Sequence, residues 1–179
     1  AEAVDKVRSS SVDVAINLTS GPGCFYEPDG FVLKPAIYPE MTPEDRVSHI
    51  VKLKPELCSL DIGSFNFGDF VAVNMESHLA VMAKLIAKAG TVPELEVFDL
   101  GQVRQARYLI EKGVLQRPGY FQFCLGIPWG APAQPEAISL MKSLLPPEAH
   151  WSAFGISREH PAPVQAGDRE RRAGQVHVV

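Results

Sequence analysis

The chain has 179 residues, 46% of them hydrophobic, and a formal net charge of -4 at pH 7. This length and composition suit one domain with a real hydrophobic core. The mild negative charge, with Lys and Arg mostly scattered, excludes the basic surface of a nucleic-acid-binding protein. No apolar run approaches the roughly 18 residues that a membrane-spanning helix needs.

The three cysteines, Cys24, Cys58 and Cys124, are odd in number, far apart and set among apolar residues. This pattern predicts a reduced cytoplasmic protein rather than a disulfide framework. The chain begins with Ala1 and carries no signal-peptide pattern, so we expect a processed chain or a fragment of a longer protein.

The first predicted element is a strand over Val12–Thr19, followed by the Gly- and Pro-rich turn "SGPG" and a long loop. A helix is predicted over Thr42–Leu53 because its start carries several signals. Thr42 can cap the helix, Pro43 suits the first helical position, and Asp45 lies three residues after the cap. The loop between the strand and the helix carries no pattern that predicts regular structure.

Strand and helix patterns then alternate to the end of the regular sequence. The further predicted elements are a strand at Leu57–Gly63, a helix at Glu76–Ala89, a strand at Glu94–Phe98, a helix at Val103–Glu111, a strand at Tyr120–Gly126, a helix at Pro135–Leu145 and a strand at His150–Ile156. The second of the four helices should bury one face and stop at Gly90. That face is formed by Leu79, Met82, Ala83, Ile86 and Ala87.

Five strands alternating with four helices predict right-handed βαβ units and a parallel sheet. Two architectures remain open: an open doubly wound sheet, or part of a (β/α)8 TIM barrel. A complete barrel typically needs about 250 residues, so a barrel in this chain would be partial. We assign residues 1–160 to this partial barrel and residues 161–179 to an atypical tail. The tail is polar and rich in Pro and Arg, and two explanations remain open: a divergent disordered terminus or a frameshifted segment.

Polar residues gather where the predicted strands end, at Thr19, Ser59, Asp61 and Glu96. The carboxyl ends of parallel strands meet at one edge, where ligands bind in both architectures. Glu96 interrupts an apolar strand, and an unpaired buried carboxylate costs several kcal/mol. Glu96 should therefore point into a polar crevice, although an exposed position or a structural ion pair remains an alternative. The turn after Thr19 can be an anion-binding nest or a plain turn.

The five histidines show no His-x-His or His-x-x-x-His spacing, so the sequence predicts no metal site in this chain. The three cysteines form no Cys-x-x-Cys pair either, and the carboxylates Glu96 and Asp99 would suit a hard cation better than zinc.

Five motifs in order, "INLTSGPG", "LKPELCSLDIGSFNFG", "PELEVFDLG", "YFQFCLGIPWGAPA" and "WSAFGIS", resemble the beta-keto acid cleavage enzyme family. The resemblance implies a zinc-dependent TIM barrel that is usually homotetrameric. It also implies the reaction of a beta-keto acid with acetyl-CoA, which gives acetoacetate and an acyl-CoA. The five strands would be the third to seventh of that barrel, so this chain resembles its central part.

The resemblance also implies roles for single residues. The hydroxyls of Thr19 and Ser59 would bind the substrate, the turn at Ser20 and Gly21 would hold its carboxylate, and Glu96 would be catalytic in the polar network. The family's zinc ligands, a His-x-His pair on the second strand and a Glu on the eighth, would lie outside this chain. We therefore expect the isolated chain to be inactive and to hold no zinc.

The sequence departs from the family pattern at two further places. Gln102 stands where a His frequently follows "FDxG", and Ser157 replaces the second Gly of "FGIGR". The alternative function is a non-catalytic partial barrel that binds a small carboxylate or only assembles with other chains. As a barrel segment the chain should be marginally stable, with two unpaired sheet edges and inward-facing apolar residues short of partners. These residues are Val14, Leu60, Val97 and Phe123.

Overall fold

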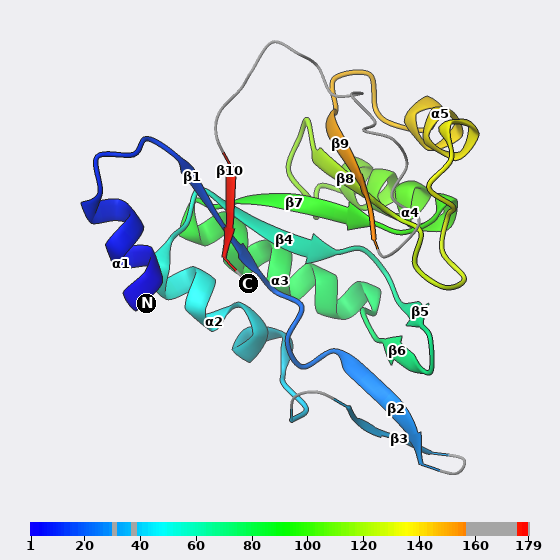
Figure 1. Ribbon diagram of the computed structural model, residues 1–179, viewed down its shortest axis with the longest axis horizontal. Helices are drawn as coiled ribbons and strands as arrows, with labels where there is room; N and C mark the ends of the chain where they lie inside the picture. The colour runs from blue at the N-terminus through cyan, green and yellow to red at the C-terminus, as the bar shows by residue number, and fades with distance from the viewer. Residues whose placement is uncertain (30–31, 37–38, 157–174, 179) are drawn as a thin grey trace.

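The computed structural model describes residues 1–29, 32–36, 39–156 and 175–178. In this described part, a sheet of six parallel strands forms the centre of the molecule, in the order β10-β1-β4-β7-β8-β9 (Figure 1). Its strands are β1 (Ala15–Thr19), β4 (Leu57–Asp61), β7 (Val92–Val97), β8 (Tyr120–Leu125), β9 (His150–Gly155) and β10 (Gln175–Val178).

The order of the strands resolves the choice between the two architectures. From β1 to β9 each parallel strand pairs with the next one along the chain, so these five strands follow one direction across the sheet, and β10 lies on the outer side of β1. A doubly wound sheet reverses its order at a switch point, whereas a barrel winds in one direction only. The sheet is also curled (Figure 1), and the fold is a partial TIM barrel, as the sequence predicted.

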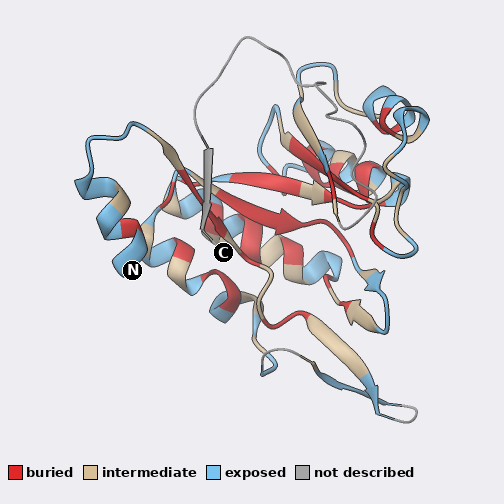
Figure 2. Cartoon of the chain, viewed as in Figure 1, coloured by how far each residue is buried: buried red, intermediate tan, exposed pale blue. Residues whose placement is uncertain are grey.

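Four helices cover one face of this sheet: α2 (Pro43–Leu53), α3 (Glu76–Ala89), α4 (Leu100–Glu111) and α5 (Pro135–Ser143). They bury the main hydrophobic core against the strands (Figure 2). Its fully buried members include Ile16, Ile50, Leu60, Leu79, Met82, Ile86, Leu95, Val97, Leu109, Phe121 and Phe123. Burying one such side chain contributes about 1.5–3 kcal/mol, so this face supplies most of the stability.

The position of the apolar strand residues corrects one prediction. Leu60, Val97 and Phe123 are fully buried among the helix residues rather than short of partners on the concave face. Val14 lies just before β1, two positions before the core residue Ile16. Side chains alternate across a strand, so the opposite face receives their polar neighbours. The strands of this barrel segment keep their apolar side chains on the helix side, because the helices are what excludes water there.

The predicted helices agree closely with the structure. Thr42 caps α2 by accepting a hydrogen bond from Asp45 N at 3.1 Å, and α3 ends at Gly90, whose φ of 80° lies in the left-handed region. Of the predicted buried face of α3, Ala87 alone is exposed. Helix α4 begins at Leu100, three residues before its predicted start, because the Asp99 side chain accepts a hydrogen bond from Gln102 N at 2.9 Å.

A second, antiparallel sheet lies in segments for which the sequence predicted no helix or strand. It contains β2 (Phe25–Asp29), β3 (Val32–Pro35), β5 (Phe65–Phe67) and β6 (Phe70–Ala72), in the order β3-β2-β6-β5. These strands are short, and Pro28 within β2 argues against a strand when only sequence is considered. Phe65 stacks on Phe98 with ring centroids 3.9 Å apart, which fixes this sheet near the carboxyl ends of the main strands.

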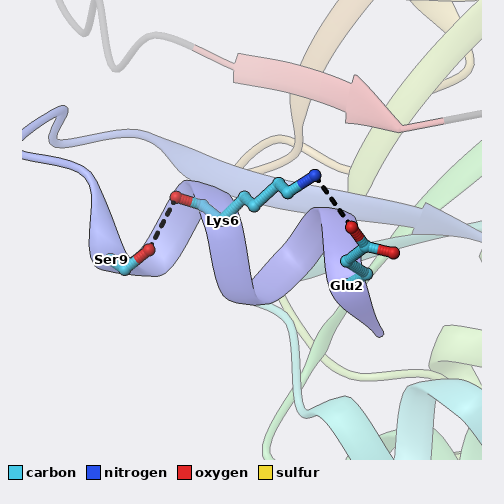
Figure 3. A network of polar contacts seen from close by, with 3 residues as sticks. All are labelled: Glu2, Lys6 and Ser9. Carbon is cyan, nitrogen blue, oxygen red and sulfur yellow. Dashed lines mark hydrogen bonds and ion pairs between the residues drawn. The ribbon is translucent and has the colours of Figure 1, made fainter.

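Helix α1 (Glu2–Ser9) was also missed by the sequence analysis. Figure 3 shows its exposed ion pair, with Lys6 Nζ 2.8 Å from Glu2 Oε1, and the Ser9 hydroxyl donating to the Lys6 carbonyl. An exposed pair of this kind contributes little stability. The helix is held instead by buried Val4 and by Arg8, whose guanidinium donates to two carbonyls at the end of α2.

Strand β10 pairs with β1 in parallel and belongs to the predicted tail. Most of that tail lies outside the described residues, so the division into residues 1–160 and 161–179 stays a prediction. Among the described helices, none has the length and apolar character that crossing a lipid bilayer requires.

Candidate functional site

The register of the sheet brings the predicted site residues onto its concave face. Thr19 pairs with Ser59 across β1 and β4, and Asp61 pairs with Glu96 across β4 and β7. Paired residues of parallel strands project to the same side, and Ser59 and Asp61 are two positions apart on one strand. The four side chains therefore share one face near the carboxyl ends of three adjacent strands.

The hydroxyls of Thr19 and Ser59 are in direct contact. Ser59 Oγ donates to Thr19 Oγ1 at 3.1 Å, and Gly21 N donates to the same oxygen at 3.1 Å. Gly21 suits this turn, because a Cβ at that position would lie 3.2 Å from Thr19 Oγ1, which is closer than most Cβ contacts. Within the described residues Thr19 Oγ1 acts as an acceptor in both of these bonds, so its own O–H is not used by either.

Ser20 faces the protein interior. Its side chain is fully buried, its hydroxyl donates to the Ser59 carbonyl at 2.7 Å, and its amide donates to the same carbonyl at 3.3 Å. The amides of Ser20 and Gly21 both bond within the protein in this structure. Their predicted contact with a substrate carboxylate, which would require these bonds to rearrange, stays a prediction.

Asp61 and Glu96 form an acid pair, in which Asp61 is buried and Glu96 is partly buried. Their carboxyl groups are hydrogen-bonded to each other, and Asp61 is only 7% exposed. Burial, followed by the negative charge of Asp61, raises the pKa of Glu96 to about 10. Burial also raises the pKa of Asp61, while the hydrogen bond from Glu96 and the charge of Arg46 oppose that rise. At neutral pH the pair therefore holds a proton on Glu96, which a neutral carboxylic acid can donate to a reacting oxygen.

A second polar layer lies on the same face, nearer the amino ends of the strands. Glu94 accepts hydrogen bonds from Asn17 Nδ2 at 2.6 Å and from Gln122 Nε2 at 3.0 Å. Gln122 also contacts Ser152 Oγ at 3.4 Å, so the layer connects β1, β7, β8 and β9. The sequence indicates this polar layer through the Glu-x-Glu spacing of β7, because residues two positions apart on a strand lie on the same face. Glu94 and Glu96 therefore share one face of β7.

Arg46 and Asn74 join the site from outside the main sheet, and the sequence analysis missed both. Arg46 extends from α2, where Nε donates to the Ser20 carbonyl at 3.0 Å and Nη1 donates to Asn74 Oδ1 at 2.8 Å. Asn74 lies just before α3, and its backbone N–H donates to Ser64 Oγ at 2.9 Å. A single Arg in a polar helix segment is typical of a solvent-exposed surface. The sequence around Arg46 therefore does not indicate that this residue contacts the site.

The described residues do not fit a zinc site. They contain no group of three or more His, Cys, Asp or Glu side chains that could hold a metal ion. Zinc in proteins takes mainly Cys sulfur and His nitrogen, whereas the concave face offers carboxylates, one of which keeps its proton. His49 contacts the Thr19 carbonyl through Nε2 at 3.0 Å.

Comparisons with known proteins agree with the resemblance seen in the sequence. A family model described as beta-keto acid cleavage enzyme matches residues 1–167. The 3-dehydrocarnitine:acetyl-CoA trimethylamine transferase of Rhizobium meliloti (strain 1021) is 38% identical over 88% of this chain and 54% of its own length. The 3-keto-5-aminohexanoate cleavage enzyme of Acetoanaerobium sticklandii is 36% identical over 66% of this chain and 43% of its own length.

The chain therefore spans about half the length of the curated relatives it matches. A solved structure of apo ObcA is 21% identical, with a TM-score of 0.46, and the match covers 62% of this chain and 22% of ObcA. This structural similarity is too low to assign a substrate or a site residue.

Proposed function

Because this chain belongs to the beta-keto acid cleavage enzyme family, we propose that the complete protein cleaves a beta-keto acid with acetyl-CoA. The products would be acetoacetate and the acyl-CoA of the remaining fragment. The name of the Rhizobium relative refers to an acetyl-CoA-dependent transfer, and the name of the Acetoanaerobium relative to keto-acid cleavage. Both names support this reaction class.

The observation that carries the proposal is the acid pair beside the hydrogen-bonded hydroxyls of Thr19 and Ser59 at the carboxyl edge of the sheet. We assign Thr19 and Ser59 to binding of the keto acid, with Gly21 and Ser20 shaping the turn beside them. Thr19 Oγ1 accepts from Ser59 and from Gly21, so its O–H can donate to a substrate oxygen. Glu96 is the catalytic residue of this chain, because its retained proton can stabilise negative charge that develops on a substrate oxygen.

The zinc expected from the resemblance does not fit the described residues, and no catalytic step of this proposal depends on it. Its ligands would come from parts of the complete protein beyond this chain. We also propose a homo-oligomeric enzyme of the cytoplasm. The three cysteines are free and buried, which suits a reducing compartment.

An assay of the complete protein tests the proposal. Acetoacetate formation is measured with acetyl-CoA and a panel of beta-keto acids that differ in side chain. We expect turnover that requires acetyl-CoA, and a loss of roughly 100-fold or more in kcat/KM for Glu96→Gln and for Thr19→Val, as for other lost transition-state contacts. Ser48→Ala on the exposed side of α2 is the matched control, because its hydroxyl bonds only within that helix. Absence of acetyl-CoA-dependent acetoacetate with every keto acid would overturn the assignment.

The alternative is a partial barrel that binds a small carboxylate without catalysis. It is favoured by the polar concave face combined with the lack of a metal-binding group among the described residues. Isothermal titration of the purified 179-residue chain with acetoacetate separates the two functions. Saturable binding without turnover in the complete protein would support the alternative.

A further inference from the structure

A pocket of about 490 Å³ lies outside the acid pair, between the antiparallel sheet and the loop that follows β8. Its walls are Glu27 and Pro28 of β2, residues 67–70 of the β5-β6 hairpin, and Pro128. Each of these segments follows the carboxyl end of a main strand, as Figure 1 shows for β5 after β4. Pockets that bind small molecules usually have volumes of about 300–1,000 Å³, so this one has room for a small ligand.

Two phenylalanines form an aromatic wall of the pocket. Phe67 and Phe70 are directly opposite each other in the β5-β6 hairpin, so their side chains project from the same face of it. Phe67 is 38% exposed. Gly68 lies in the turn between them, with a φ of 63° and open space where a Cβ would lie. The turn therefore adds no side chain that could cover the rings.

The charged residues of the pocket wall are both acidic. Glu27 and Asp69 line the pocket, and no Lys, Arg or His is among the described residues that line it. Glu27 follows Tyr26, which pairs with Val71, so it lies beside Phe70 at the next position of the register. Lys34 Nζ is 3.5 Å from Glu27 Oε1, with both side chains at least 36% exposed. Such an exposed pair is weak, so an ammonium group of a ligand can replace the lysine.

The loop that carries Pro128 is fixed by a tight turn. Gly130 N donates to the Ile127 carbonyl at 3.1 Å, and a Cβ on Gly130 would lie only 2.6 Å from Ile127 Cγ1. Trp129 has a φ of 68°, which is uncommon for a residue other than glycine and persists where the surrounding structure holds it. Its side chain is 84% exposed. The turn therefore places Pro128 at the pocket and leaves the neighbouring indole in contact with solvent.

We propose that this pocket binds a small organic cation of the alkylammonium class. Aromatic rings attract a cation through their electron-rich faces, and carboxylates add a direct attraction between opposite charges. An anion would be repelled by Glu27 and Asp69, and a neutral apolar ligand would gain nothing from them. The described residues contain no group of three or more side chains that could hold a metal ion. Binding of the cation requires no turnover, so the proposal does not rest on the proposed function.

The test is isothermal titration of the complete protein with choline chloride and, separately, with 3,3-dimethylbutan-1-ol at the same ionic strength. The alcohol has the shape of choline without its charge. We expect saturable binding of one choline per chain, and binding of the alcohol that is weaker by about fivefold or more. Asp69→Asn and Phe67→Leu should each weaken choline binding by about fivefold, because one removes a charge and the other removes a ring.

Two variants outside the pocket are the matched controls. Asp13→Asn removes a charge from an exposed position before β1, and Phe154→Leu removes a ring that is 42% exposed on β9. Both should bind choline as the wild type does. If a pocket variant does not fold, Lys34→Met replaces it, because this change removes the ammonium beside Glu27 and leaves the pocket wall intact. Choline should bind this variant more tightly than the wild type.

Four results would overturn the proposal. They are the absence of saturable choline binding, equal affinity for the neutral alcohol, an equal loss of affinity in the control and pocket variants, and unchanged affinity in Lys34→Met. The first result would show that the pocket takes no alkylammonium ion, and the second that it is only an apolar cavity. An assay of keto-acid cleavage decides the proposed function separately, because none of these titrations depends on it.

Discussion

At the scale of single residues, the acid pair depends on where two neighbouring strands place their side chains: Asp61 on β4 lies opposite Glu96 on β7. Glu96 stands out because a carboxylate within an apolar strand needs a partner, and the structure supplies that partner as Asp61. The pairing depends on the register between β4 and β7, which places Asp61 beside Glu96. Register is set by contacts between segments distant in sequence, so a reading of local patterns does not contain it. Arg46 escaped notice for the same reason, since its partners lie 26 and 28 residues away.

The raised pKa of Glu96 predicts a specific dependence of stability on pH. Its pKa is about 10 in the folded chain against 4.5 as an ordinary value, so the folded state binds the extra proton between these limits. This contribution is fully present below the lower value and is lost as pH rises, by at most about 1.4 kcal/mol per pH unit. Glu96→Gln keeps a donor for Asp61 and removes the titration. Its free energy of unfolding, measured with urea, should therefore increase relative to the wild type as pH rises.

The matched control for this experiment is Glu111→Gln, because Glu111 is 60% exposed and forms only a long ion pair with Arg107. Its difference from the wild type should stay constant between the acid and alkaline ends of the range. Parallel stability curves for Glu96→Gln and the wild type would show that Glu96 is already ionised in the folded chain.

The three cysteines should react slowly in the folded protein. Burial raises the pKa of Cys24 and of Cys58 to about 12, and raises the pKa of Cys124 as well. The thiolate is the reactive form, so neutral buried thiols are poor nucleophiles. Titration with a thiol reagent should find all three thiols only after denaturant is added. Rapid modification of one cysteine under native conditions would identify a local opening near it.

At the scale of elements, prediction succeeded where a local signal defines the element. Helix α2 begins at a capped Thr-Pro sequence, and α3 ends at a glycine with positive φ, so both could be read from a few adjacent residues. The antiparallel sheet could not be predicted, because its strands have three to five residues and gain their stability from one another and from Phe65 on Phe98. Helix α1 depends in the same way on its contacts with α2.

The cap of α2 gives a prediction at this scale. Thr42 Oγ1 accepts a hydrogen bond from Asp45 N at 3.1 Å and donates one to Asp45 Oδ2 at 2.7 Å. Both hydrogen bonds stabilise the first turn of the helix. Thr42→Ala should lower the free energy of unfolding by about 1 kcal/mol. Ser48→Ala, which removes an exposed hydroxyl from the same helix, should change it by less than about 0.5 kcal/mol. Equal effects of the two substitutions in a thermal or urea melt would show that the cap has no special role.

At the scale of the whole molecule, the fold divides the chain into two faces with different tasks. The helix-covered face carries the apolar side chains and the stability, and the concave face carries Glu94, Glu96, Asp61 and their partners. The sequence predicted the curled parallel sheet but assigned several apolar residues to the wrong face. Alternation along a strand shows which residues share a face, and only the packed helices decide which face excludes water.

This arrangement changes the expected cause of instability in the isolated chain. The concave face is mainly polar, so it gives little reason for association. The backbone edge of β9 can associate with other chains, because among the described strands β9 has a strand neighbour on one side only. On that strand Phe154 is 42% exposed. Unpaired edges with exposed apolar residues associate with other strands, and a charge on the edge strand opposes this association. We predict that the 179-residue chain self-associates through β9.

Light scattering during gel filtration, over a range of protein concentrations, measures this directly. The average mass should increase with concentration in the wild-type chain, and Phe154→Lys should reduce the increase, because a buried lysine at a strand-to-strand contact would lose its hydration without gaining a partner. Leu140→Lys is the matched control: Leu140 is 51% exposed and belongs to helix α5 rather than to the edge strand, and the substitution adds the same charge to the chain. A monomeric mass at all concentrations, or an equal effect of the two lysines, would contradict association through β9. The comparison separates edge pairing from general adhesion of apolar surface, since only pairing along β9 depends on where the charge is placed.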